Sequence, residues 1–251
     1  MRRSLDQINS NYQKSKVDQW GSDWRGSLAF WHTFCIDIIT KEIGKQSNLL
    51  NKPLSILEIG CGSGVLTEKV VSALKRVCKI DHYLAVDVSL AAINKAKEIF
   101  PNTTVDYQAV SEDLHDLNGQ KFDLILGFQF LFYLSREERQ NLFERIYNLK
   151  SEDGMVILSS NIRFDSEDPD YINAPSTDID LKKYFTILKE ADIFTAPYVE
   201  YWEGKMLKIK KLPFISYILS KEYFPKKAHQ YYSKRAMPTI PNKRTRVYIL
   251  Q

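Results

Sequence analysis

The chain has 251 residues, of which 44% are hydrophobic and 26% charged. This balance is typical of a soluble globular protein, and the length suits one large α/β domain with room for an insertion. No apolar run approaches the roughly 18–20 residues that span a bilayer. The first fifteen residues contain two arginines but no apolar segment of a secretory signal. We therefore expect a cytoplasmic protein.

The cysteines and histidines argue against a disulfide framework and against a metal site. Cys35, Cys61 and Cys78 form an odd, scattered set, and none of the four histidines pairs with another at ligand spacing. We therefore expect no metal ion.

The net charge of +4 is unevenly distributed along the chain. Residues 205–251 contain twelve Lys and Arg and a single acid, a net charge of +11, so the remainder carries −7. A basic segment on an acidic body indicates an anionic partner. A solvated surface without a partner is the other interpretation.

Helical periodicity appears first at residues 27–43, where the apolar side chains fall on one face. After a polar linker, short apolar runs alternate with amphipathic segments. We predict strands at 54–60, 83–89, 103–110, 122–128 and 155–160, and helices at 65–80, 90–100 and 135–149. Ser135 and Glu138 form a capping box at the start of the last of these helices. This alternation predicts an α/β fold whose parallel sheet is covered on both faces.

The pattern is looser after residue 160. Residues 161–177 have turn composition, and we predict a helix at 178–191, a strand at 194–204 and a last strand at 244–251. The predicted organisation is one domain over 1–251, with an N-terminal helical cap at 1–50, a core at 54–204 and 244–251, and a basic, aromatic insertion at 205–242.

The strongest signal for function is a glycine-rich turn between the first predicted strand and the next helix. The spacing Gly60-x-Gly62-x-Gly64 lets backbone N–H groups approach a ligand, but differs from the G-x-G-x-x-G of a pyrophosphate site. Glu58, just before the turn, would repel a phosphate and tolerate a cation. Asp87, at the end of the second predicted strand, can accept hydrogen bonds from both hydroxyls of a ribose. A ligand with a ribose, no phosphate and a positive sulfonium suits this set.

Five segments together resemble the successive motifs of class I S-adenosylmethionine-dependent methyltransferases. They are LEIGCGSGVLT (57–67), AVDVS (85–89), SEDL (111–114), FDLILGFQFLFYL (122–134) and LKSEDGMVILSS (149–160). The resemblance implies a Rossmann-like sheet of seven strands, mostly parallel with an antiparallel last strand, with helices on both faces. It also implies S-adenosylmethionine as the cofactor.

The same resemblance implies a set of cofactor-binding residues. They are Glu58, Gly60, Cys61, Gly62, Gly64, Asp87, Val88, Ser111, Glu112 and Gln129. In the family, the glycines surround the methionine portion, the acid equivalent to Asp87 holds the ribose, and residues at Ser111 and Glu112 flank the adenine. Gln129 falls where relatives contact the methionine portion or the substrate.

One position departs from the family pattern. Many relatives bind the adenine amino group with an aspartate that is replaced here by Val110. This leaves the adenine contact to Ser111 and Glu112, with Asp113 as a substitute. For the acids of this loop a solvated turn is the alternative, and for the glycine turn a Rossmann-like domain with a different ligand.

Aromatic residues are concentrated ahead of the first predicted strand. Tyr12, Trp20 and Trp24 are candidates for a lid over cofactor and substrate, since aromatic faces attract a sulfonium, and ordinary packing is the alternative. DQWGSDW before a helix, together with FLFYL, is also weakly similar to the nodulation N-methyltransferase group of this superfamily.

Methyl transfer needs alignment of nucleophile, methyl carbon and sulfur, and exclusion of water. A dedicated base is required only when the nucleophile is a hydroxyl or a protonated amine. His32, Tyr133 and His229 are candidates for that base, although a lone histidine is more often structural or exposed.

The chain has no Asn/Asp-Pro-Pro-Tyr motif of nucleic-acid amino methyltransferases, so nucleic acid is not the expected acceptor. We expect methylation of an O or N atom of a small molecule such as a sugar, nucleotide sugar, glycan or natural product. The insertion at 205–242 could bind an anionic acceptor, rest on an anionic membrane through 205–235, or pack in a dimer. An RNA-modifying enzyme and an inactive methyltransferase-like binding subunit are the alternative functions.

Overall fold

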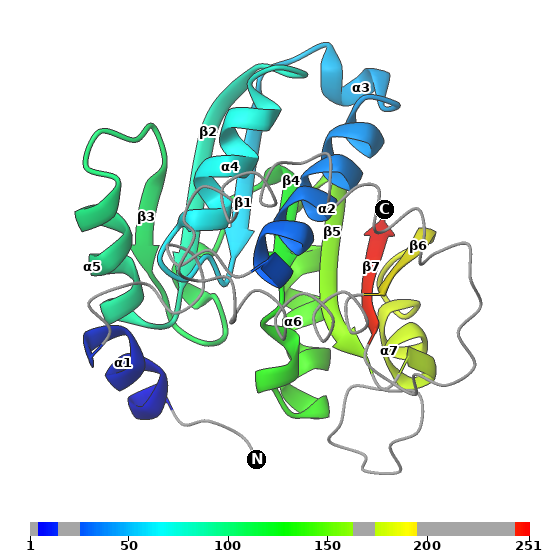
Figure 1. Cartoon of the computed structure of the whole chain (residues 1–251). Helices are drawn as coiled ribbons and strands as arrows, with labels where there is room; N and C mark the ends of the chain where they lie inside the picture. Colours follow the sequence, from blue (N-terminus) through cyan, green and yellow to red (C-terminus); the bar gives the residue numbers. More distant parts are fainter. Residues whose placement is uncertain (1–4, 15–25, 163–173, 195–243) are drawn as a thin grey trace.

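The computed structural model describes residues 5–14, 26–162, 174–194 and 244–251. They form a seven-stranded sheet in the order β3-β2-β1-β4-β5-β7-β6 (Figure 1). The strands are β1 (Leu54–Ile59), β2 (Ile80–Asp87), β3 (Asp106–Ala109), β4 (Phe122–Phe128), β5 (Lys150–Ile162), β6 (Ile187–Phe194) and β7 (Arg244–Leu250). β1 to β5 pair in parallel, whereas β7 runs antiparallel to both of its neighbours, β5 and β6. The predicted Rossmann-like sheet with an antiparallel last strand is confirmed.

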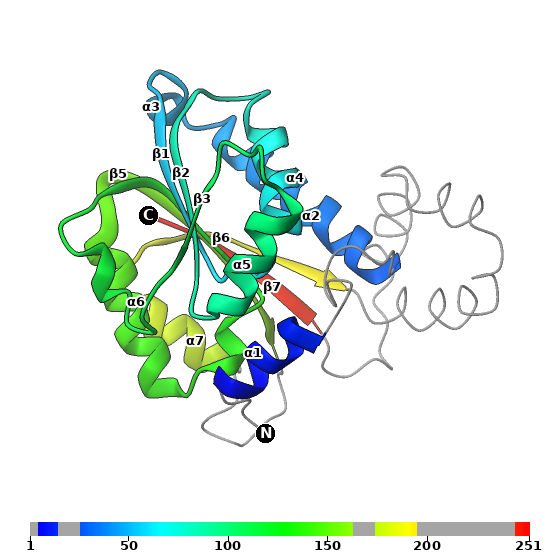
Figure 2. The same cartoon turned by 90° about the vertical axis from the view of Figure 1, so that its left-hand side faces the viewer.

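Helices cover both faces of this sheet, as Figure 2 shows. They are α1 (Leu5–Lys14), α2 (Gly26–Ile43), α3 (Ser47–Leu50), α4 (Val65–Leu74), α5 (Leu90–Ile99), α6 (Arg136–Leu149) and α7 (Ala174–Leu181), with short 3-10 helices η1 (His115–Leu117) and η2 (Leu131–Tyr133). Apolar side chains of α2, α4 and α5 share one core cluster, and those of α6 and α7 share the other. The strands β1 and β4 are buried along almost their whole length, as a parallel sheet between two helical layers requires.

Capping hydrogen bonds are present at the predicted starts of two helices, α5 and α6. Ser89 caps α5 by accepting a hydrogen bond from the Ala92 amide. At α6 the Ser135 hydroxyl and the Glu138 carboxylate each accept a hydrogen bond from the other's backbone amide, so the predicted capping box is confirmed.

Several predicted boundaries in the core are wrong. β3 begins at Asp106 instead of residue 103, and β5 runs from Lys150 to Ile162 instead of from residue 155 to residue 160. α4 ends at Leu74 instead of residue 80, and β2 begins at Ile80 instead of residue 83. The first residues of β2 are exposed, and Asp81 and His82 gave no apolar signal for a strand. Pairing with β1, through Leu54 and Ile80, nevertheless extends the strand to this point. Parallel pairing thus overrides the local polar composition.

The helix predicted at 178–191 is also wrong. α7 starts earlier, at Ala174, and ends at Leu181, and the chain then becomes strand β6 from Ile187. Leu181, Phe185 and Leu188 are spaced as on a helix, but Leu188 is exposed. Antiparallel pairing with β7 stabilises the strand in place of the helix.

The strand predicted at 194–204 shares only Phe194 with β6, and residues 195–204 and the insertion at 205–242 lie outside the described residues. Among the described helices, none is long and apolar enough to cross a membrane.

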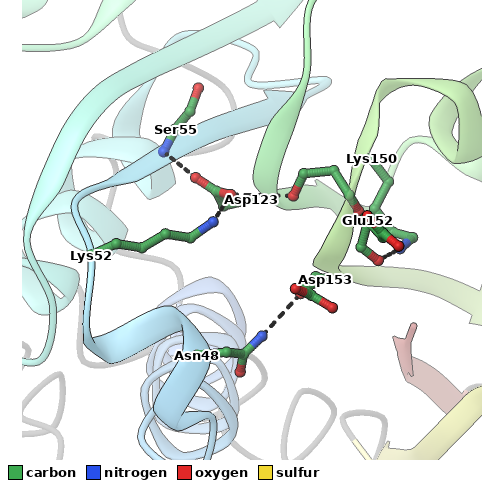
Figure 3. Close-up of polar contacts among 8 residues, drawn as sticks. Asn48, Lys52, Ser55, Asp123, Lys150, Glu152 and Asp153 are labelled. Carbon is green, nitrogen blue, oxygen red and sulfur yellow. Dashed lines mark hydrogen bonds and ion pairs between the residues drawn. The ribbon is translucent and has the colours of Figure 1, made fainter.

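Polar contacts tie the amino ends of the strands together (Figure 3). Asp123, at the start of β4, accepts hydrogen bonds from Lys52 Nζ at 2.6 Å, the Ser55 amide at 3.0 Å and the Ser151 hydroxyl at 3.2 Å. Asn48 donates to the Asp153 carbonyl at 3.1 Å. These bonds join α3, β1, β4 and β5 at one edge, and leave the opposite, carboxyl edge to the functional residues.

Candidate functional site

The glycine turn lies at the carboxyl end of β1 and leads into α4. Gly60, Gly62 and Gly64 have φ values of 75°, 56° and 79°, which is the left-handed region that side-chain-bearing residues rarely adopt. Space is also short, because a Cβ atom on Gly60 would lie 3.0 Å from the Phe130 ring and one on Gly62 would lie 2.8 Å from the Tyr12 hydroxyl. The positive φ angles therefore favour glycine at all three positions, and at Gly60 the Phe130 ring also leaves little room for a side chain.

Asp87 holds the turn against the end of β2. Its two carboxylate oxygens accept hydrogen bonds from the Gly62 and Ser89 amides, each at 2.9 Å. Burial raises the pKa of Asp87, against the opposing effect of these two hydrogen bonds. Since each carboxylate oxygen can accept a second bond, Asp87 retains the capacity to bind two adjacent hydroxyl groups.

Glu58 is buried beneath the turn, with 2% of its surface exposed. The Tyr83 hydroxyl of β2 donates a hydrogen bond to Glu58 Oε2 at 2.7 Å. Burial is the largest influence on this carboxyl and raises its pKa to about 7, although the bond from Tyr83 acts in the opposite direction. Cys61 is also buried, and its thiol pKa is raised by burial and by the neighbouring acids Asp87 and Glu58.

The loop after β3 is organised mainly by its own side chains. The Ser111 amide and hydroxyl both donate to Asp116 Oδ2, and the His115 amide donates to Asp113 Oδ1 at 3.1 Å. Glu112 is exposed. The amide of Val110 bonds to the carbonyl of Asp87 at 3.1 Å, so the loop starts beside the ribose-binding candidate. The structure thus brings Ser111 to the edge of the site with its hydroxyl already engaged.

Gln129 follows β4 with a φ of 57°, which is uncommon for a residue with a side chain. Its amide donates to the carbonyl of Ser159, at the end of β5, at 3.1 Å. Phe130 packs against Gly60 and Gly127. The chain therefore turns sharply at Gln129, where the carboxyl ends of β1, β4 and β5 meet.

The N-terminal helix α1 packs beside α5 at the same edge (Figure 1). Its Asn9 Oδ1 accepts a hydrogen bond from the Ser89 hydroxyl at 2.6 Å. Its Tyr12 hydroxyl stands over Gly62. α1 thus touches the two residues, Gly62 and Ser89, whose amides bind Asp87. Trp20 and Trp24, the other lid candidates, lie outside the described residues.

Two of the three candidates for the catalytic base lie in the described part of the chain. His32, on α2, is buried, and its Nδ1 lies 3.1 Å from Lys69 Nζ, which donates to it. Burial, followed by the charge of Lys69, lowers the pKa of His32 to about 3, so the ring is neutral and a weak base at neutral pH. Tyr133, in η2, is half-buried and packs on Phe132 with ring centroids 4.3 Å apart. His229 lies outside the described residues.

The residues at this edge fit a cationic nucleoside. Asp87 suits a ribose diol, and Glu58, Glu68 and Asp87 give the turn a negative environment that favours a positive charge and disfavours a phosphate. Among the described residues, no group of three or more His, Cys, Asp or Glu side chains could hold a metal ion.

Sequence reasoning missed Tyr83, Asn9 and Phe130. Tyr83 and Glu58 lie on one face of neighbouring strands, and the available signal was a polar aromatic residue in an otherwise apolar strand. The pairing register, with Ile56 beside Tyr83 and Glu58 beside Ala85, was needed to bring the two together.

Comparison with known proteins agrees with this geometry. A methyltransferase domain family matches residues 57–156. The chain is 30% identical over 113 residues to a carboxy-S-adenosyl-L-methionine synthase of a Shewanella species, covering 44% of this chain and 45% of that protein. It is 31% identical over 106 residues to nodulation protein S of Azorhizobium caulinodans, covering 42% and 48%. The chain thus matches less than half the length of these curated relatives.

A solved structure covers more of the chain. The N-methyltransferase NodS of Bradyrhizobium japonicum WM9, in complex with S-adenosyl-L-homocysteine, superposes with a TM-score of 0.62 over 98% of this chain and 96% of that chain, at 14% identity. At this level of identity, the likeness shows that the two chains share a fold. The family match shows a methyltransferase domain at residues 57–156, and the relatives and the fold support a class I S-adenosylmethionine-dependent methyltransferase.

Proposed function

We propose that this protein transfers a methyl group from S-adenosylmethionine to an O or N atom of a small molecule. The observation that carries the proposal is the pairing of Asp87 with the glycine turn, in which one carboxylate fixes Gly62 and Ser89 and can still bind a ribose diol. When bound, the cofactor supplies an activated methyl group. The chain's own residues bind and orient it, and shield it from water.

We propose the ten residues named in the sequence analysis as its cofactor contacts, with different roles in the fold. Glu58 supplies negative charge beneath the turn, and Asp87 binds the ribose. Ser111 and Glu112 border the adenine. Because the amide and the hydroxyl of Ser111 both bond to Asp116, packing is the contact left to Ser111. Gln129 lies at the junction of β4 and β5, where its sharp turn is a candidate for contact with the acceptor.

Tyr12 is proposed as part of a lid, because α1 covers the glycine turn and is held by Asn9. Trp20 and Trp24 remain candidates for the same lid. For the base, a neutral His32 bonded to Lys69 favours a positioning role, so Tyr133, His229, or a nucleophile that needs no base are the remaining choices.

The proposed acceptor is a sugar, nucleotide sugar, glycan or natural product. The net charge of +11 over residues 205–251 supports an anionic one. The relative NodS carries the name N-methyltransferase, which supports nitrogen as one target atom. The insertion at 205–242 is the proposed acceptor-binding element of the single domain, with membrane contact or dimerisation as its alternative roles.

Turnover with a panel of acceptors tests this proposal. S-adenosylhomocysteine formation is measured with amino sugars, nucleotide sugars, phosphorylated glycans and short RNA. We expect product with one small-molecule class, depending on both acceptor and enzyme. Turnover only with RNA would support the RNA-modifying alternative, and cofactor binding without any turnover would support an inactive binding subunit.

A further inference from the structure

Glu58 and Tyr83 form a buried polar contact in which only Glu58 has a role in the proposed function so far. Glu58 and Tyr83 are 2% and 1% exposed, and the 2.7 Å hydrogen bond between them joins β1, near its carboxyl end, to the middle of β2. A buried carboxylate needs a partner to remain charged, because burial disfavours its ionised form. In the described structure Tyr83 provides that partner as a neutral donor instead of as a cation.

The electrostatic surroundings make this bond important. The titratable and charged groups on the elements packed around Glu58 are Cys61 of the turn, Glu68 and Lys69 of α4, Asp87 of β2, Tyr107 of β3 and His32 of α2. Glu68 and Asp87 both act to raise the pKa of Glu58, and Lys69 donates to His32 instead. Burial and the two acids hold that pKa at about 7, against the opposing effects of the Tyr83 and Thr67 hydroxyls. Of these two hydroxyls, Tyr83 has the larger effect and makes a 2.7 Å hydrogen bond, so the charge of Glu58 at neutral pH is sensitive to its loss.

We propose that Tyr83 is a positioning residue for cofactor binding, and that its hydroxyl keeps Glu58 ionised beneath the glycine turn so that the negative charge favours a cationic cofactor. This inference rests on the proposed function. A cation that binds near Glu58 stabilises its ionised form, so binding releases a proton from the fraction of molecules in which Glu58 is neutral. Affinity for the cofactor therefore rises with pH across neutrality.

Calorimetry tests this linkage without an acceptor. S-adenosylmethionine and S-adenosylhomocysteine are titrated into the full chain at pH 6, 7, 8 and 9, in two buffers of different ionisation enthalpy, so that proton release is measured together with affinity. The variants are Tyr83→Phe and Glu58→Gln. The matched control is Tyr248→Phe, which removes another buried tyrosine hydroxyl that donates to a carboxylate, that of Asp178 at 2.8 Å on the far side of the sheet.

In the wild type we expect S-adenosylmethionine affinity to rise about fivefold to tenfold from pH 6 to pH 8, with proton release near pH 7. Tyr83→Phe should weaken binding about fivefold at pH 7 and move the pH midpoint upward, with wild-type affinity regained at pH 9. Glu58→Gln should remove the Glu58-dependent part of the pH profile. Tyr248→Phe should leave the profile unchanged. Ionisation of the ligand itself contributes equally to the wild type and to every variant. Differences between their pH profiles therefore report on Glu58.

A uniform loss of affinity in Tyr83→Phe at every pH would overturn the inference, since a packing defect has that signature. If Tyr83→Phe does not fold, the Glu58→Gln variant tests the proposal. A pH profile of cofactor affinity in Glu58→Gln that equals that of the wild type would contradict the proposal. Failure of the wild type to bind either ligand would instead contradict the proposed function.

Discussion

At the scale of single residues, the site combines groups whose conformation or ionisation is costly. Gln129 adopts a positive φ angle, and burial raises the pKa of Glu58. Such costs persist where the surrounding structure enforces them, and they concentrate at functional sites. Here they lie at one edge of the sheet, around the ends of β1, β2 and β4.

Glu58→Gln should therefore stabilise the free protein at high pH. The pKa of Glu58 is raised to about 7 in the folded state, so the stability that its neutral form provides is full below pH 4 and is lost as pH rises through 7. We expect the variant to gain about 1–3 kcal/mol in the free energy of unfolding at pH 8 and little at pH 4.5, measured by urea denaturation. The exposed Glu112→Gln is the control. An equal gain at both pH values would show that charge is not the cause.

At the scale of elements, α1 packs beside α5 next to the glycine turn. Asn9 binds the Ser89 hydroxyl, and that hydroxyl also caps α5. Movement of α1 would expose Gly62 while the sheet stays intact. This arrangement suits a segment that opens for ligand exchange.

Asn9→Ala should speed release of S-adenosylhomocysteine about threefold to tenfold, because one hydrogen bond holding α1 is lost. Stopped-flow displacement measures the rate. Asn11→Ala, on the same helix, should leave it within twofold of wild type. Equal rates in both variants and the wild type would argue that α1 does not limit release.

The opposite edge of the sheet serves stability. Burial would raise the pKa of Asp123, but the bonds from Lys52 and the Ser55 amide outweigh it and hold that pKa below its ordinary value. Asp123 therefore contributes stability above its unfolded pKa, and this contribution is lost as pH falls through the folded value.

Asp123→Ala should cost about 1–3 kcal/mol of the free energy of unfolding at pH 7, because the Ser55 amide and Lys52 lose their acceptor. The cost should shrink at pH 3, and cofactor affinity should be unchanged. Denaturant unfolding measures the cost at pH 7 and at pH 3. Asp153→Ala is the neighbouring control, because Asn48 donates to the carbonyl of Asp153 and not to its side chain. A cost that persists in full at pH 3 would contradict the electrostatic explanation.

At the scale of the whole molecule, the fold followed from periodicity and the glycine motif. Apolar strands and capping residues such as Ser135 are local signals, so the alternation of strands and helices from β1 to β5 and the positions of Gly62 and Asp87 could be predicted, whereas the short helix α3 in the polar linker was not. The start of β2 and the identity of β6 could not, because long-range pairing with β1 and β7 decides them. Tyr83 was not predicted for the same reason, because its hydrogen-bond partner Glu58 lies on another strand.

The central claim is that Asp87 and the glycine turn bind S-adenosylmethionine, and calorimetry on three proteins tests it most directly. The wild type should bind, Asp87→Ala should bind about tenfold to a hundredfold more weakly, and Asp81→Ala, at the exposed start of the same strand, should match the wild type. Absence of binding in the wild type, or equal affinity in Asp87→Ala, would contradict the claim.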